Sequence, residues 1–142
     1  MEILITLLIL LFSAIIHEVS HGLAAEKLGD STARDEGRIT LNPIPHIDPF
    51  GSILLPALLL FVGSPIIFGA AKPVPVNFDA LRPRKLGMAL VSFAGPASNF
   101  ILAILMILPI KFGLLSGIMA EYWLKAVVMN LVLGTFNLLP IP

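Results

Sequence analysis

The sequence predicts an all-α polytopic membrane protein, with about four transmembrane or re-entrant helices and a short extended or β insertion after the first helix. Composition is the first reason. Hydrophobic residues make up 57% of the 142 residues, charged residues only 13%, and the mean hydropathy is +0.97. A soluble domain carries about 25% charged residues, so this chain lacks the polar surface of a water-facing globule. Its length suits one domain, and we expect residues 1–142 to form a single domain embedded in the lipid bilayer.

Four apolar stretches are the second reason, because each approaches or exceeds the ~20 residues that a helix needs to cross a ~30 Å hydrocarbon layer. They comprise residues 3–28, 51–71, 86–110 and 118–139. Helix is the default in lipid, since every backbone polar group must be satisfied internally. Pro56 and Pro65 interrupt the second stretch, which we therefore expect to be a broken or re-entrant helix.

The predicted insertion lies in the polar segment that follows the first stretch. Residues 38–42 alternate weakly between polar and apolar side chains, a pattern that indicates a short strand. Prolines at positions 43, 45 and 49 would prevent its continuation.

Charge and cysteine content exclude several classes of partner and site. Nine basic residues balance nine acidic ones and there is no cysteine, so we expect no nucleic-acid partner and no Cys-ligated zinc. The loop 72–85 holds four basic residues and one acidic residue, and the positive-inside rule assigns it to the cytoplasm. If all four stretches span the bilayer, the amino terminus lies on the same side as this loop. If the second stretch is re-entrant, the two lie on opposite sides.

The sharpest chemical signal is the run His-Glu-Val-Ser-His at residues 17–21. Positions i and i+4 share one face of a helix, so His17 and His21 can bind one cation. Neutral imidazole is a good zinc ligand, and Glu18 lies where a carboxylate can exchange a proton with metal-activated water. Ionisable residues at the end of an apolar helix are costly and are functional by default. The alternative is a histidine pair that only caps the helix end.

A second motif, Ala-Gly-Pro-Ala-Ser-Asn at residues 94–99, lies in the middle of the third stretch. Pro96 removes a helix hydrogen bond and Gly95 permits close backbone approach. Asn99 can then hydrogen-bond across helices or to a substrate backbone. The alternative is small-residue helix packing with a kink.

Two further segments supply candidate supporting residues. Near the carboxyl end, Asn137 is a polar group at membrane depth, and Pro140 and Pro142 convert the helix into extended backbone. Such backbone could dock a substrate strand, or it could simply leave the membrane. In the loop after the first stretch, His46 and Asp48 could support or ligate a metal, although a lone loop histidine is usually only solvated.

Together these motifs resemble the site-2 protease family of intramembrane zinc metalloproteases. The resemblance also includes the loop 41–51 and the segment 69–76, and it covers essentially the whole chain in the expected order. It implies Zn²⁺ as cofactor, His17 and His21 as ligands and Glu18 as general base. It further implies hydrolysis of peptide bonds in or near transmembrane segments of other proteins, by an integral protein of a prokaryotic plasma membrane.

One departure from the family pattern concerns the third zinc ligand. In the family the closing motif continues to an Asp-Gly whose aspartate binds zinc, and this sequence stops at Pro142. We expect a truncated sequence. The alternatives are a third ligand from elsewhere in the chain, and an inactive homologue that binds partner helices through the Gly95 and Asn99 face. A metal transporter, with histidines and kinked helices as its ion path, is a further alternative.

Overall fold

The computed structural model describes residues 2–139, and all regular secondary structure in that range is helical, without a strand. Its elements are α1 (Glu2–Lys27), α2 (Thr32–Asp35), η1 (Ile44–His46), η2 (Pro49–Leu54), α3 (Leu55–Phe61), α4 (Arg84–Lys111) and α5 (Gly117–Leu138). The predicted all-helical class is therefore confirmed.

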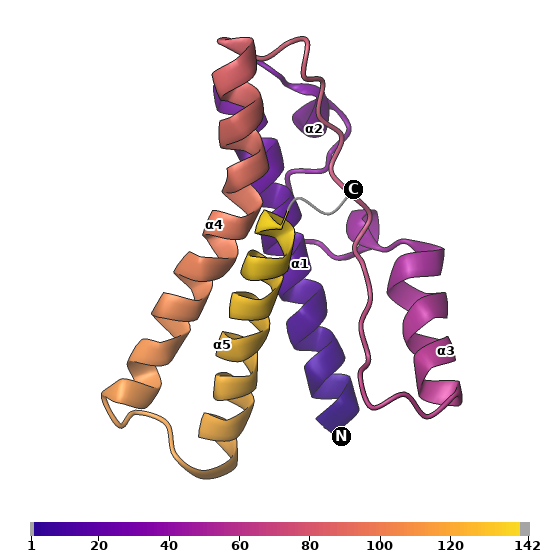
Figure 1. The fold of residues 1–142 in the computed structure, drawn as a ribbon, viewed down its shortest axis with the longest axis vertical. Helices are drawn as coiled ribbons and strands as arrows, with labels where there is room; N and C mark the ends of the chain where they lie inside the picture. Colours follow the sequence, from indigo (N-terminus) through magenta and orange to yellow (C-terminus); the bar gives the residue numbers. More distant parts are fainter. Residues whose placement is uncertain (1, 140–142) are drawn as a thin grey trace.

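Three of these helices, α1, α4 and α5, are long and apolar enough to cross a membrane. They contain 26, 28 and 22 residues, against the ~20 that a span requires. Helix α4 packs against both α1 and α5, and the three form one bundle (Figure 1). Few large apolar side chains are buried in this bundle, and most face outward, as expected for helices whose outer surface contacts lipid rather than water.

The second apolar stretch is broken, as its prolines predicted. A six-residue π-helical turn, η2, continues into the seven-residue α3, which starts with Pro56 in its first turn. This helix is too short to cross a ~30 Å layer. After it the chain turns at Gly63, which has a positive φ of 68°, and runs back along α3 towards the start of α4 (Figure 1). The start of α1 and the basic loop 72–85 therefore lie at opposite ends of the bundle (Figure 1), the parity expected for a re-entrant second stretch.

The strand predicted at residues 38–42 was wrong. Local side-chain bonds hold this segment as bends: Thr40 Oγ1 accepts from the Asn42 N–H at 3.1 Å, and the Thr40 carbonyl accepts from His46 Nε2 at 2.9 Å. The Arg38 guanidinium, rather than its backbone, contacts the facing segment and donates to the Lys72 and Pro73 carbonyls at 2.8 and 3.1 Å. Side-chain bonds of this kind compete with a backbone ladder.

Residues 66–77 form an extended path without regular secondary structure, and we call them the return segment. Every second N–H group from Ala70 to Val74 donates a hydrogen bond to a different element. The N–H of Ala70 donates to the Gly51 carbonyl at 3.0 Å, and that of Lys72 donates to the His46 carbonyl at 2.8 Å. The return segment is thereby fixed beside α1.

The end of α1 is joined to the return segment by Asp30, which is 2% exposed. Its carboxylate accepts from the Thr32 hydroxyl at 2.5 Å, from the Thr32 N–H at 3.0 Å and from the Asn77 N–H at 2.7 Å. Burial alone would raise the pKa of Asp30, but the bonds from Thr32 and Asn77 outweigh burial and hold the pKa below its ordinary value. The ionised form is therefore part of the folded structure.

Replacing Asp30 with Asn is expected to lower the free energy of unfolding by about 1–3 kcal/mol, because three donors lose a charged acceptor. A lowered folded-state pKa contributes stability above the unfolded pKa of ~3.9, and that stability is lost as the pH falls through the folded value. Thermal unfolding in detergent across this acidic range should show the loss in the wild type and a flatter profile in Asp30→Asn. Asp35→Asn, at an exposed carboxylate on α2, is the matched control, and an equal effect there would contradict the account.

Candidate metal centre

Helix α1 brings His17, Glu18 and His21 to one place, because their spacing puts both imidazoles on the same face. The helix begins with an acidic residue and ends with a basic one, Lys27, as the helix dipole favours. His17 is 7% exposed, whereas Glu18 and His21 are half-buried. The three side chains therefore lie at the edge of the bundle core, and His17 and Glu18 line a pocket there.

The inner nitrogen of each imidazole faces an oxygen atom of α4. His17 Nδ1 lies 2.5 Å from Asn99 Oδ1, and His21 Nδ1 lies 2.6 Å from the carbonyl oxygen of Val91, in the turn before Pro96. Both oxygens can only accept, so we assign the Nδ1 proton to each ring. The lone pair of each neutral ring is then on Nε2, the arrangement by which metal-binding histidines are usually oriented.

The two Nε2 atoms converge at 3.0 Å from each other. Two lone pairs at this distance repel unless a cation or a proton lies between them. A zinc ion bonds imidazole nitrogen at ~2.0–2.1 Å, so a single ion can reach both atoms. Neutral imidazole nitrogen is also the donor type that zinc prefers, and these residues fit the metal.

Gly95 leaves the room in which the two rings meet. A Cβ atom at this position would overlap the Nε2 atoms of both His17 and His21. We predicted that Gly95 allows close approach of another backbone. The close approach is instead that of the two imidazoles, and Gly95, Pro96 and Asn99 are all buried against α1.

Glu18 faces the same site from the side of the return segment. Its Oε2 accepts a hydrogen bond from the Val74 N–H at 2.8 Å, which fixes the carboxylate and leaves Oε1 for other partners. His17, Glu18 and Asn137 line one pocket of about 180 Å³ together with residues 69–71 of the return segment. Asn137, from the last turn of α5, is exposed, and its amide also donates to the Leu133 carbonyl at 2.8 Å.

His46 and Asp48 lie elsewhere in the loop. His46 is 0% exposed and bonds to Thr40 through Nε2, while Asp48 accepts from the Gly51 N–H at 2.6 Å and caps η2. Among residues 2–139, no group of three His, Cys, Asp or Glu side chains is placed to hold a metal. Pro140 and Pro142, which we expected to form extended backbone, lie outside the described residues.

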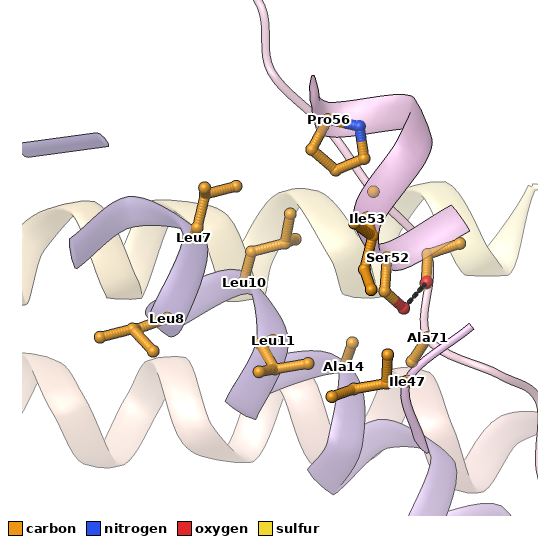
Figure 2. A pocket seen from close by; sticks show the side chains of 12 residues that line it. Leu7, Leu8, Leu10, Leu11, Ala14, Ile47, Ser52, Ile53, Pro56 and Ala71 are labelled. Atoms are coloured by element: carbon orange, nitrogen blue, oxygen red, sulfur yellow. Dashed lines mark hydrogen bonds between the residues drawn. The ribbon is translucent and has the colours of Figure 1, made fainter. Parts of the chain in front are cut away.

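A second, apolar pocket of about 170 Å³ adjoins the one that His17 and Glu18 line. Figure 2 shows Leu10, Leu11 and Ala14 of α1 facing Ile47 and Ile53 of the loop and η2. Its outer wall is fixed by the Ser52 hydroxyl, which donates to the Ala70 carbonyl at 2.7 Å. Both pockets share Ala14 and residues 69–71, so an apolar surface leads to His17 and Glu18.

Sequence reasoning missed two contacts of this site. One is the Val74 N–H on Glu18, which no local pattern indicates. The other is a buried asparagine, Asn130 of α5, whose amide nitrogen and oxygen bond to α1 and α4. Its signal was present in the sequence, since a polar residue at membrane depth is rare and functional by default.

Fold and site together define a class of protein: a bundle of long apolar helices that contains two converging histidines with an adjacent carboxylate. Comparison with known proteins agrees with this class. The chain is 42% identical to "Putative zinc metalloprotease YwhC" of Bacillus subtilis, over 94% of the chain and 61% of that relative.

Two mycobacterial proteins named "Putative zinc metalloprotease Rip2" are also similar. The identity is 31% to the protein of Mycolicibacterium smegmatis and 33% to that of Mycobacterium tuberculosis, in each case over 93% of the chain and 50% of the relative. The chain thus spans between half and about three-fifths of the length of these curated relatives. No family model matches the chain, and no solved structure matches it significantly.

Proposed function

We propose that this chain belongs to an intramembrane zinc endopeptidase of the site-2 type, which hydrolyses peptide bonds in or near transmembrane segments of membrane proteins. The observation that carries the proposal is the convergence of two imidazole Nε2 atoms at 3.0 Å, with both Nδ1 atoms held by acceptors. The names of the YwhC and Rip2 relatives support zinc as the metal and proteolysis as the reaction.

Zinc, when bound, supplies Lewis-acid activation of water and of the scissile carbonyl. His17 and His21 hold the metal, and Asn99 and the Val91 carbonyl orient the two rings. Glu18 takes a proton from the attacking water at Oε1 and returns it to the leaving amine. Catalytic zinc ordinarily has three protein ligands, and the described residues supply two, so the activity is proposed for the intact protein.

The pocket dimensions support an unwound substrate. A helix with its side chains is ~10–12 Å across, and the pocket beside the histidines has a volume of only about 180 Å³. We therefore expect a substrate segment to enter this pocket in an extended form and not as an intact helix. The carboxamide of Asn137, which lines the same pocket, is placed to hydrogen-bond such exposed backbone.

The scaffold alternative is not favoured by the geometry. It requires the Gly95 and Asn99 face of α4 to be free for a partner helix. That face is covered by α1, and Asn99 is 0% exposed.

The test is cleavage of a synthetic single-span peptide, with Gly and Pro in its apolar segment, by the intact protein in lipid vesicles. We expect cleavage within or beside the apolar segment, detected by mass spectrometry, its loss with a zinc chelator and its return when zinc is added. Cleavage that continues at the same rate in metal-depleted protein would contradict the proposed function.

A further inference from the structure

Asn130, near the middle of α5, lies at the end of a buried chain of polar groups that reaches His17. It is 0% exposed, as is its neighbour Asn99 on α4. Asn99 Nδ2 donates to Asn130 Oδ1 at 2.8 Å, and Asn130 Nδ2 donates to Ser13 Oγ and to the Ala126 carbonyl, both at 2.9 Å. Residues of all three long helices are therefore joined by these hydrogen bonds.

The direction of every bond in the chain follows from one atom that can only accept, the carbonyl oxygen of Ala126. The Asn130 amide must therefore point its nitrogen, and not its oxygen, towards the Ala126 carbonyl. The amide oxygen of Asn130 then faces Asn99, which must present its nitrogen. Asn99 thereby presents its oxygen to His17 Nδ1, which must carry the proton.

We propose that Asn130 is a positioning residue of the metal centre: it fixes the orientation of the Asn99 amide, and through it the His17 tautomer whose Nε2 lone pair can bind zinc. The inference rests on the metal site of the proposed function, not on proteolysis. Asn130 acts only through Asn99, since it has no direct hydrogen bond with His17 among the described residues.

Without Asn130 the Asn99 amide has little to hold it. Among the described residues, its hydrogen bonds are then the one with His17 itself and a long one of 3.4 Å from Nδ2 to the Ser13 carbonyl. A flipped amide would present its NH₂ group to His17 Nδ1. The ring would then have to accept at Nδ1, and its proton would occupy Nε2, the atom that faces His21.

The experiment measures zinc affinity of the purified chain in detergent, by competition with a zinc chelator dye, for wild type and Asn130→Leu. Outer-shell changes typically weaken metal affinity 10–100-fold, and we expect a loss in this range. Thr135→Val is the matched control on the same helix, because the Thr135 hydroxyl bonds only to the Leu131 carbonyl of α5. It should bind zinc as the wild type does. Circular dichroism measures the folded fraction of each variant.

A double-mutant cycle with Asn99→Leu separates positioning from general packing. If Asn130 acts through Asn99, then Asn130→Leu has no further effect on zinc affinity once Asn99 is Leu. Independent, multiplying effects would overturn the proposal.

Zinc affinity and peptide cleavage are measured separately, so a failure of the Asn130 proposal can be told apart from a failure of the proposed function. A protein that binds zinc in an Asn130-dependent manner but cleaves no peptide would refute proteolysis and leave the positioning role standing. An active protease whose zinc affinity is unchanged in Asn130→Leu would do the reverse.

Discussion

Replacing Glu18 with Gln is expected to lower the rate of peptide hydrolysis by about 10²–10⁴-fold, the range typical of a lost general acid–base group. Gln keeps an oxygen that can accept from the Val74 N–H, the bond that fixes the native carboxylate at 2.8 Å. The side chain therefore stays in place while its capacity to take a proton is lost. Zinc content should be unchanged, because neither ligand is altered. Initial cleavage rates in vesicles, with zinc measured on the same samples, give both values.

Glu36→Gln is the matched control for the Glu18 variant. Glu36 is exposed beyond α2, and it is not among the residues lining the histidine pocket, so its replacement should leave both rate and zinc content at the wild-type values. Normal cleavage by Glu18→Gln would show that the proton is carried by another group and that the mechanism is wrong.

Replacing Gly95 with Ala is the second change with a large expected effect. The added Cβ would overlap the Nε2 atoms of both His17 and His21. At least one ring must then turn away and give up its bond to Asn99 or to the Val91 carbonyl. We expect zinc affinity to fall by more than the 10–100-fold of an outer-shell change, with loss of activity as a consequence. Competition titration with a chelator dye measures the affinity.

Gly87→Ala provides the control within the same helix. A Cβ at Gly87 would meet the Leu81 side chain, with its Cβ 3.0 Å away, and no histidine atom. It should lower thermal stability without changing zinc affinity per folded chain. If Gly95→Ala bound zinc as tightly as Gly87→Ala, the convergence of the two imidazoles could not be the metal site.

The approach of His17 to His21 and the general fold could be predicted because both depend on local periodicity. His17 and His21 share a helix face whatever packs around them, and apolar stretches of this length must be helical in lipid. Pro65 likewise lies just beyond the end of α3, where it prevents the helix from continuing, while Pro56 is accommodated in the first turn of α3. These features require no knowledge of which elements are neighbours.

The features that were missed or wrong depend on tertiary neighbours. A strand at residues 38–42 needed a paired backbone, but the Arg38 side chain bonds to the return segment instead. The bond from the Val74 N–H to Glu18 joins residues 56 positions apart, and that from Asn130 to Ser13 joins residues 117 apart. The role of Gly95 was equally hidden, because only the packed structure shows which atoms come within reach of its Cα.

The measurement that tests the central claim most directly is the zinc bound per chain at equilibrium, at a fixed free zinc concentration, for wild type, His17→Ala and His21→Ala. The account predicts that the wild type binds one zinc ion with an affinity that falls in both variants, because each removes one of the two Nε2 atoms that lie 3.0 Å apart. Equal zinc binding by the wild type and either variant would contradict it, and would mean that the histidine pair is not the metal site.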